Sequence, residues 1–211
     1  MEKLLIIGAS GHGKVVAEIA ELSNSWSEIA FIDDNPNAFL KDYQVLGSSS
    51  LLEQLQNQYL HAFVAIGNNQ VRLSLINRLQ KLGYKIPVLV HPKSIVSTSC
   101  SISSASVVMA GAVINPDCKI GTGCIINTGS TIDHDCTLED GVHVSPGAHL
   151  AGTVHVGKAS WVCLGANIIN NTVVGVNSVV AAGATVISNV PDNVLVAGTP
   201  AKIKKHYLKN A

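Results

Sequence analysis

The chain has 211 residues, a length that allows one or two domains. Its 14 Lys and Arg residues balance its 14 Asp and Glu residues without a run of like charge, which argues against binding to nucleic acid or to an anionic membrane surface. The chain has neither a run of about 18 apolar residues nor a signal-peptide pattern, so we expect a cytoplasmic protein that does not insert into a membrane.

The first part of the chain has the pattern of an α/β domain. Residues 3–7 predict a strand and residues 15–22 a helix, and between them lies the glycine-rich turn Gly8-Ala9-Ser10-Gly11-His12-Gly13. Such a unit binds phosphate through backbone N–H groups at the helix N-terminus. Because the glycine spacing only partly matches the dinucleotide fingerprint, it indicates a phosphorylated nucleotide more than NAD. We expect Ser10, Gly11, His12 and Gly13 to bind it.

Two further predicted strands end in polar residues. Residues 29–32 end at Asp33 and Asp34, about 20 residues beyond the glycines, where an acidic residue contacts a ribose or base. An ordinary turn before a proline is the alternative. Residues 62–66 lead into Gly67, Asn68 and Asn69, and the ends of parallel strands meet at one edge of a sheet, so these loops are expected to line one site. Residues 46–55 and 72–82 predict helices, and residues 86–90 a last strand.

The second part of the chain repeats every six residues. Sixteen consecutive hexads, without an insertion, carry Leu, Ile or Val at the same place, and the residue two positions earlier is usually small. This period fits neither an ordinary helix nor a half-buried strand, and it predicts a parallel β-helix with coils of about 18 residues stacked about 4.8 Å apart. Glycines after these rungs, such as Gly121, Gly157 and Gly175, are expected at corners with unusual dihedral angles. The rungs are Val96, Ile102, Val108, Ile114, Ile120, Ile126, Ile132, Leu138, Val144, Leu150, Val156, Val162, Ile168, Val174, Val180 and Val186.

The five cysteines fit a reducing compartment. Cys100, Cys118 and Cys136 are eighteen residues apart, so they should stack on one corner of consecutive coils as small core residues. The chain has no Cys-x-x-Cys pair, and we expect no metal site. Cys163 follows a rung and is a weaker candidate for a reactive thiol.

Several motifs together carry a resemblance to a known family. They are the segments 10–13, 33–34, 67–69 and 198–202, together with Asn127 and the pair His134-Asp135. In this combination the chain resembles the sialic acid O-acetyltransferase-like family, whose members include N-acetyltransferases of UDP-4-amino-4,6-dideoxy sugars.

The resemblance implies an architecture and two substrates. It implies an α/β Rossmann-like domain over residues 1–92, which holds a nucleotide-linked amino sugar, and a left-handed β-helix over residues 93–211. It further implies a homotrimer that binds acetyl-CoA in grooves between neighbouring rods. The resemblance also assigns sites: His134 and Asp135 to catalysis, Asn127 to the sugar, and His143, Ser145, Gly152 and Lys202 to acetyl-CoA, with the Gly152 amide beside the developing oxyanion.

The chemistry of acetyl transfer asks for a base. An imidazole, with an ordinary pKa near 6.5, can accept the proton of an amine that attacks a thioester. The sequence leaves open whether Asp135 contacts His134 and whether the nucleotide is UDP or GDP. It also leaves two other functions open: O-acetylation of sialic acid or another sugar, and the role of a non-catalytic β-helix scaffold.

Overall fold

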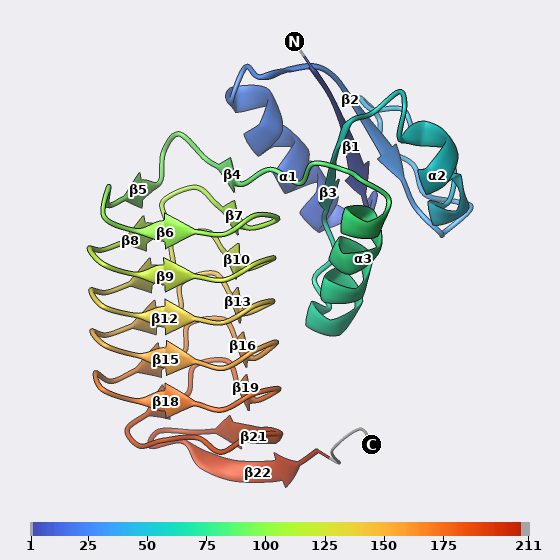
Figure 1. Cartoon of the computed structure of the whole chain (residues 1–211). Coiled ribbons are helices and arrows are strands. Elements are labelled where there is room, and N and C mark those ends of the chain that lie inside the picture. Colours follow the sequence, from blue (N-terminus) through green and yellow to red (C-terminus); the bar gives the residue numbers. More distant parts are fainter. Residues whose placement is uncertain (1, 208–211) are drawn as a thin grey trace. The chain divides into compact units, whose positions relative to one another are not determined.

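The structure, a computed structural model, describes residues 2–207, so the last four residues of the predicted second domain lie outside it. The chain divides into two compact units, Met1–Pro92 and Lys93–Ala211. Figure 1 shows a small α/β unit and a rod of stacked coils. Within the described residues, no helix is long and apolar enough to span a membrane.

The first unit is built on a parallel sheet. Strands β1 (Glu2–Ile7), β2 (Trp26–Ile32) and β3 (His61–Val64) pair in the order β2-β1-β3. Their apolar runs are buried, as expected for parallel strands covered on both faces. The helices are α1 (Gly11–Leu22), the short pair η1 (Ser49–Leu51) and α2 (Leu52–Leu55), and α3 (Asn69–Lys81), and β4 (Leu89–Val90) follows them.

All predicted elements of this unit except one are present with ends that differ by up to four residues, and three differences matter most. Helix α1 begins at Gly11 rather than at residue 15, so the glycine-rich turn runs directly into its first turn. The predicted helix over residues 46–55 is wrong in its first part, because the Leu46 N–H donates to the Phe31 carbonyl oxygen at 2.8 Å beside β2. The last predicted strand is confined to its final two residues, in β4.

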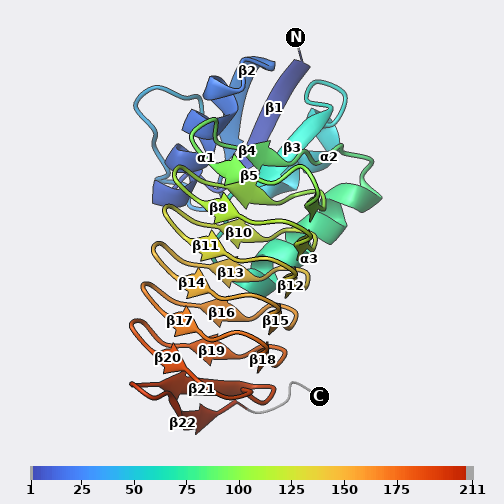
Figure 2. The same ribbon diagram turned by 90° about the vertical axis from the view of Figure 1, so that its left-hand side faces the viewer.

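The second unit confirms the hexad prediction. Its described residues contain sixteen two-residue strands, and each rung is the second residue of its strand. Strands three apart in the chain pair in parallel, so three sides form a prism (Figures 1 and 2). The left-handed winding stays a prediction of the resemblance.

We name the three sides by their strands. The β10 side contains β7 (Val107–Val108), β10 (Ile125–Ile126), β13 (His143–Val144), β16 (Trp161–Val162) and β19 (Val179–Val180). The β11 side contains β5 (Ile95–Val96), β8 (Val113–Ile114), β11 (Thr131–Ile132), β14 (His149–Leu150), β17 (Asn167–Ile168) and β20 (Thr185–Val186). The β12 side contains β6 (Ser101–Ile102), β9 (Lys119–Ile120), β12 (Thr137–Leu138), β15 (His155–Val156) and β18 (Val173–Val174). Strand β21 (Val194–Ala197) continues the β10 side, and β22 (Lys202–His206) pairs with it in antiparallel fashion.

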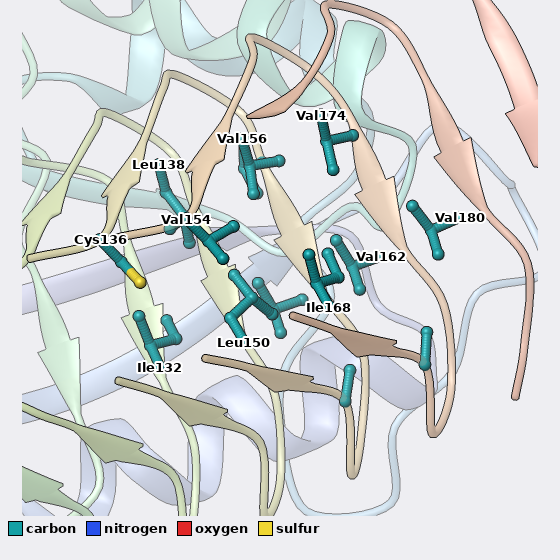
Figure 3. Packing of buried hydrophobic residues seen from close by; sticks show 14 of the residues in the cluster. Ile132, Cys136, Leu138, Leu150, Val154, Val156, Val162, Ile168, Val174 and Val180 are labelled. Carbon is teal, nitrogen blue, oxygen red and sulfur yellow. The ribbon is translucent and has the colours of Figure 1, made fainter. Parts of the chain in front are cut away.

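The rungs fill the interior of the prism. From Val108 to Val186 every rung is at most 3% exposed, and Figure 3 shows the aliphatic side chains of successive coils stacked inside. Because each coil buries its apolar side chains against its neighbours, we expect the rod to unfold as one cooperative body.

Two features of the backbone recur at the corners of the rod. A residue with positive φ recurs every six positions from Ala105 to Gly183, the third residue after each rung. The glycines directly after rungs do not share this conformation, so the expectation for them is wrong. They are small for another reason: an added Cβ at Gly121 or Gly157 would lie 2.7 Å from a backbone nitrogen of the next coil.

Candidate active site

The predicted catalytic pair lies at the corner between β11 and β12. His134 Nδ1 donates to Asp135 Oδ2 at 2.8 Å, so the two neighbours do make contact. Asp135 has a φ of 59°, a conformation that Asp tolerates better than most residues. Because the carboxylate can only accept, it places the ring proton on Nδ1 and leaves the lone pair on Nε2. The pair thus presents a base on an exposed corner.

Two residues that the sequence did not single out support this pair. Asp133 Oδ1 accepts from the His134 backbone N–H and from Asn115 Nδ2, both at 2.8 Å. The hydrogen bond to Asp135 raises the pKa of His134, and the negative charges of Asp133 and Asp135 add to the effect. Asn115 and Asp133 are eighteen residues apart, one coil of the rod, and this spacing could have identified them.

Gly152 lies one coil beyond His134, under its ring. An added Cβ at Gly152 would come within 2.6 Å of Cε1 and Nε2 of His134. The Thr153 N–H donates to the His134 carbonyl oxygen at 2.8 Å, which ties the two turns together. The glycine therefore makes the space in which the imidazole lies.

A second cluster forms on the β10 side. Asn127 Nδ2 lies 3.2 Å from His143 Nε2, and the His143 ring stacks on Trp161 with centroids 5.7 Å apart at 10°. Trp161 Nε1 donates to Ser145 Oγ at 2.7 Å. Trp161 thus joins His143 to Ser145, and His143 in turn contacts Asn127. The sequence did not single out this tryptophan, although it lies eighteen residues after His143.

A groove of about 360 Å³ on the β11 side runs beside the catalytic corner. It is lined by Asn115, Asp133, His149, Ala151 and Ile169, among others. Its lining includes the residues directly before His134 and Gly152, so a substrate in the groove would approach the imidazole.

The first unit has a cavity of about 470 Å³ at the carboxyl edge of its sheet. Asp33 and Asp34 line it, together with Gly8 and apolar side chains such as Ile66 and Val71. Both aspartates also hold the backbone: Asp33 Oδ2 accepts from Ala9 N–H at 2.7 Å, and Asp34 accepts from the Ser49 N–H at 2.7 Å. The bonds from Ser49 lower the pKa of Asp34, which therefore stays ionised.

The glycine-rich turn packs tightly at the start of α1. A Cβ at Gly13 would lie 2.1 Å from the Gly8 carbonyl oxygen, so helix and strand approach closely only because residue 13 is a glycine. Ser10 precedes the helix, and Gly11 and His12 open it. Burial, and then the charge of Arg72, lowers the pKa of His12 to about 4, so this ring is neutral.

The loop after β3, which is predicted to bind a ligand, also makes structural hydrogen bonds. Asn68 caps α3 by accepting from two backbone N–H groups at 3.1 Å. The guanidinium of Arg72, only 1% exposed, donates to Asn69 Oδ1 at 2.8 Å and to the Gly67 carbonyl oxygen at 3.1 Å. Asn68 and Asn69 therefore have roles in the local fold, and neither they nor Gly67 line the 470 Å³ cavity, so their part in ligand binding stays a prediction.

Two further candidates lie apart from these clusters. Lys202 is exposed in β22, beyond the last coil of the rod. Burial raises the pKa of Cys163 to about 11, so its thiol is protonated near neutral pH. This argues against a catalytic thiol at Cys163.

Known proteins match both parts of the chain. The family model of the PglD N-terminal domain matches residues 3–79, and the bacterial transferase hexapeptide model (six repeats) matches residues 99–134. A curated relative, UDP-N-acetylbacillosamine N-acetyltransferase of Bacillus subtilis (strain 168), is 38% identical over 114 residues, which are 52% of this chain and 52% of the relative. This match thus spans about half the length of the curated relative.

Solved structures match over nearly the whole chain. The acetyltransferase domain of PglB from Neisseria gonorrhoeae FA1090, in complex with acetyl coenzyme A, is 42% identical, with a TM-score of 0.93, over 96% of this chain and 99% of that one. A histidine-to-asparagine mutant of perosamine N-acetyltransferase from Caulobacter crescentus, in complex with CoA and GDP-perosamine, is 36% identical, with a TM-score of 0.94, over 97% of this chain and 98% of that one. The chain therefore belongs to the family of hexapeptide-repeat sugar N-acetyltransferases with a PglD-type N-terminal domain.

Proposed function

We propose that the chain is an acetyl-CoA-dependent N-acetyltransferase that acetylates the amine of a UDP-linked 4-amino-4,6-dideoxy sugar. One observation carries this proposal beyond the family: the hydrogen bond from His134 Nδ1 to Asp135 Oδ2, at 2.8 Å, on an exposed corner. It prepares Nε2 as a base at the place where the family resemblance requires one.

The reaction is a direct transfer between two bound substrates. The neutral sugar amine attacks the thioester carbonyl carbon, the new C–N bond forms, and the C–S bond breaks to release CoA. His134 Nε2 accepts the proton that the nitrogen loses. The Gly152 N–H stabilises the negative charge that develops on the carbonyl oxygen. No acyl-enzyme is needed, which agrees with the high pKa of the Cys163 thiol.

The two units have separate tasks in this proposal. The first unit binds the nucleotide in the cavity lined by Asp33 and Asp34, with the phosphates near the amides of residues 10–13. The rod binds acetyl-CoA through His143, Ser145, Gly152 and Lys202, and Asn127 contacts the sugar. The related structures support both ligands, since one contains acetyl coenzyme A and another contains CoA with GDP-perosamine. UDP is our choice because the curated relative is a UDP-N-acetylbacillosamine N-acetyltransferase.

We further propose a homotrimer in which each site is shared between two rods. The cluster of Asn127, His143 and Trp161 lies on the β10 side, whereas His134 and Asp135 lie at the corner between β11 and β12. A neighbouring copy would bring the β10 side of one rod to the catalytic corner of the next. In this arrangement the cluster of one rod and the catalytic pair of the next rod both contribute to a single active site.

The decisive assay measures CoA release with acetyl-CoA and a panel of UDP- and GDP-linked amino sugars. Release that depends on a nucleotide-linked 4-amino sugar supports the proposal, and a preference for the UDP form supports the choice of nucleotide. Release with free sialic acid alone would favour O-acetylation, and no release with any acceptor would favour a scaffold.

Mixed assembly tests the shared site. His134→Ala and Asn127→Ala should each be nearly inactive alone. Co-refolded in equal amounts, they should recover about a quarter of wild-type activity, because each of the two required residues is intact in half of the contributing copies. No recovery in mixed trimers would place the whole site within one chain.

A further inference from the structure

A ladder of thiols lies inside the rod at the corner that carries His134. Cys100, Cys118 and Cys136 occupy the same corner position in consecutive coils, eighteen residues apart. Cys118 and Cys136 are at most 1% exposed, and Figure 3 shows the Cys136 sulfur inside the prism near the rungs of its coil. The acetyl-transfer mechanism does not use these thiols.

Each thiol donates a hydrogen bond to a backbone carbonyl of the next coil. Cys118 Sγ lies 3.0 Å from the Asp133 carbonyl oxygen, and Cys136 Sγ lies 3.2 Å from the Ala151 carbonyl oxygen. Asp133 directly precedes His134, and Ala151 directly precedes Gly152. The two thiols therefore hold, from inside, the backbone that presents the imidazole and the glycine beneath it.

The chemical state of Cys118 suits donation. The neighbouring Cys136 thiol and burial raise the pKa of Cys118, so this side chain stays a neutral thiol with a proton to donate. A buried carbonyl oxygen that lost its donor would be left with an unsatisfied acceptor position, which costs stability or makes the turn move.

Equivalent positions elsewhere in the same rod show that the fold does not require a thiol donor at this place. Ser106 Oγ donates to the Gly121 carbonyl oxygen at 2.8 Å, so serine can make the same bond. Val154 occupies the next position of the catalytic corner, is 1% exposed and has no donor group, so the core also accepts a valine there. Cys124 Sγ makes the equivalent bond to the Glu139 carbonyl oxygen, at 3.2 Å, on another corner.

We propose that Cys118 and Cys136 are positioning residues for acetyl transfer: their thiols fix the backbone before His134 and before Gly152, and so set the place of the imidazole. This inference rests on the proposed acetyltransferase function. It assigns the cysteines a role beyond that of small core residues.

The test compares donor and non-donor variants of Cys118. Cys118→Ala and Cys118→Val should lower kcat about tenfold, with little change in either KM, because a displaced catalytic group costs rate rather than binding. Cys118→Ser should restore kcat to within about twofold, since serine makes this bond elsewhere in the rod. Cys136→Ala should also lower kcat, through Gly152. Cys124→Ala is the matched control, because it deletes an equally buried sulfur and its hydrogen bond away from His134.

The outcomes separate positioning from stability and from the function itself. Equal falls in melting temperature for Cys118→Ala and Cys124→Ala, with a fall in kcat only in the former, support the proposal. Equal kcat in the two variants, or no rescue by serine, overturns it. If the wild type transfers no acetyl group, the proposed function fails. The NMR signals of the His134 ring then still test the positioning, since they should change in Cys118→Ala and not in Cys124→Ala.

Discussion

Gly152 lies beneath the imidazole of His134, where an added Cβ would come within 2.6 Å of both Cε1 and Nε2. The two residues are one coil apart, and the Thr153 N–H holds the His134 carbonyl oxygen at 2.8 Å, so neither turn can move away easily. Residue 152 must therefore be a glycine, because any side chain there would displace the imidazole of His134.

Gly152→Ala should therefore displace the ring and lower kcat by about 10². Alanine keeps the backbone N–H proposed to stabilise the oxyanion, so the loss would report on the ring. Steady-state kinetics, with the binding of CoA measured separately, would check this. Gly165→Ala is the control, because its Cβ meets no atom within 4 Å and only its positive φ is strained. Wild-type kcat in Gly152→Ala would contradict the assigned position of His134.

Replacing the base should affect chemistry rather than folding. We expect His134→Ala to lower kcat by about 10² to 10⁴ while CoA binding and the melting temperature stay near wild type. Asp135→Asn should do less, since an amide oxygen can still accept from Nδ1. His155→Ala is a matched control, because His155 also contacts a carboxylate, Glu139 Oε1 at 2.9 Å, away from the catalytic corner. Activity within a few-fold of wild type in His134→Ala would assign the base elsewhere, with His143 the next candidate.

The pH dependence should follow the raised pKa of His134. The ring acts as a base only when it is neutral, so kcat/KM should rise with pH through a pKa above the ordinary value of about 6.5. In Asp135→Asn the negative charge is lost and the pKa of His134 falls. The rise should then move to lower pH, while the plateau decreases. A pH profile that does not move in this variant would show that another group controls the acidic limb.

Much of the rod could be predicted from the sequence because every coil repeats the same six-residue pattern. Each of the sixteen rungs lies in a strand at the expected place. The eighteen-residue repeat also relates Asn115 to Asp133, His134 to Gly152 and His143 to Trp161, yet the sequence prediction applied it only to the cysteines. Those contacts depend on where side chains point from corners with positive φ, which the period alone does not specify.

The first unit was harder to predict because its elements are held by contacts distant in sequence. Residues with helical spacing before Ser49 are extended, since Leu46 bonds to Phe31 beside β2. Asn68, which the sequence predicts to bind the substrate, is also the N-cap of α3. A capping asparagine and a binding asparagine after a strand have the same sequence pattern, so the pattern alone does not reveal the capping role.

Removing the tryptophan of the β10 side should weaken acetyl-CoA binding. Trp161→Ala removes the ring that stacks on His143 and the donor to Ser145. The stack, which contributes about 0.5–1.5 kcal/mol, holds the His143 ring in place, so without it acetyl-CoA must order that ring on binding and KM for acetyl-CoA should rise about two- to tenfold. KM for the nucleotide sugar should change less. Trp161→Phe keeps an aromatic face and should recover most of the loss, whereas equal KM values in all three proteins would exclude this cluster from the acetyl-CoA site.

The proposed separate tasks of the two units can be tested at Asp33 and Asp34. Changing Asp33 and Asp34 together to Ala should raise KM for the nucleotide sugar and leave KM for acetyl-CoA nearly unchanged, because both carboxylates line the cavity of the first unit. The loss includes their bonds to Ala9 and Ser49, so the single variants Asp33→Asn and Asp34→Asn, which keep one acceptor oxygen, should show smaller effects. Asp42→Ala, in the same unit and outside this cavity, should behave as wild type.

The same reasoning predicts a poor reaction with the free amino sugar. Binding energy from the nucleotide, remote from the reacting amine, holds that amine in place, so its removal should lower kcat/KM strongly. The measurement is a comparison of kcat/KM for free and nucleotide-linked sugars in the wild type and in the Asp33 and Asp34 double variant. If the nucleotide is anchored in this cavity, the double variant should lose activity only toward the linked sugar. Equal kcat/KM for both sugars in the wild type would refute the nucleotide's role and point to an acceptor such as free sialic acid.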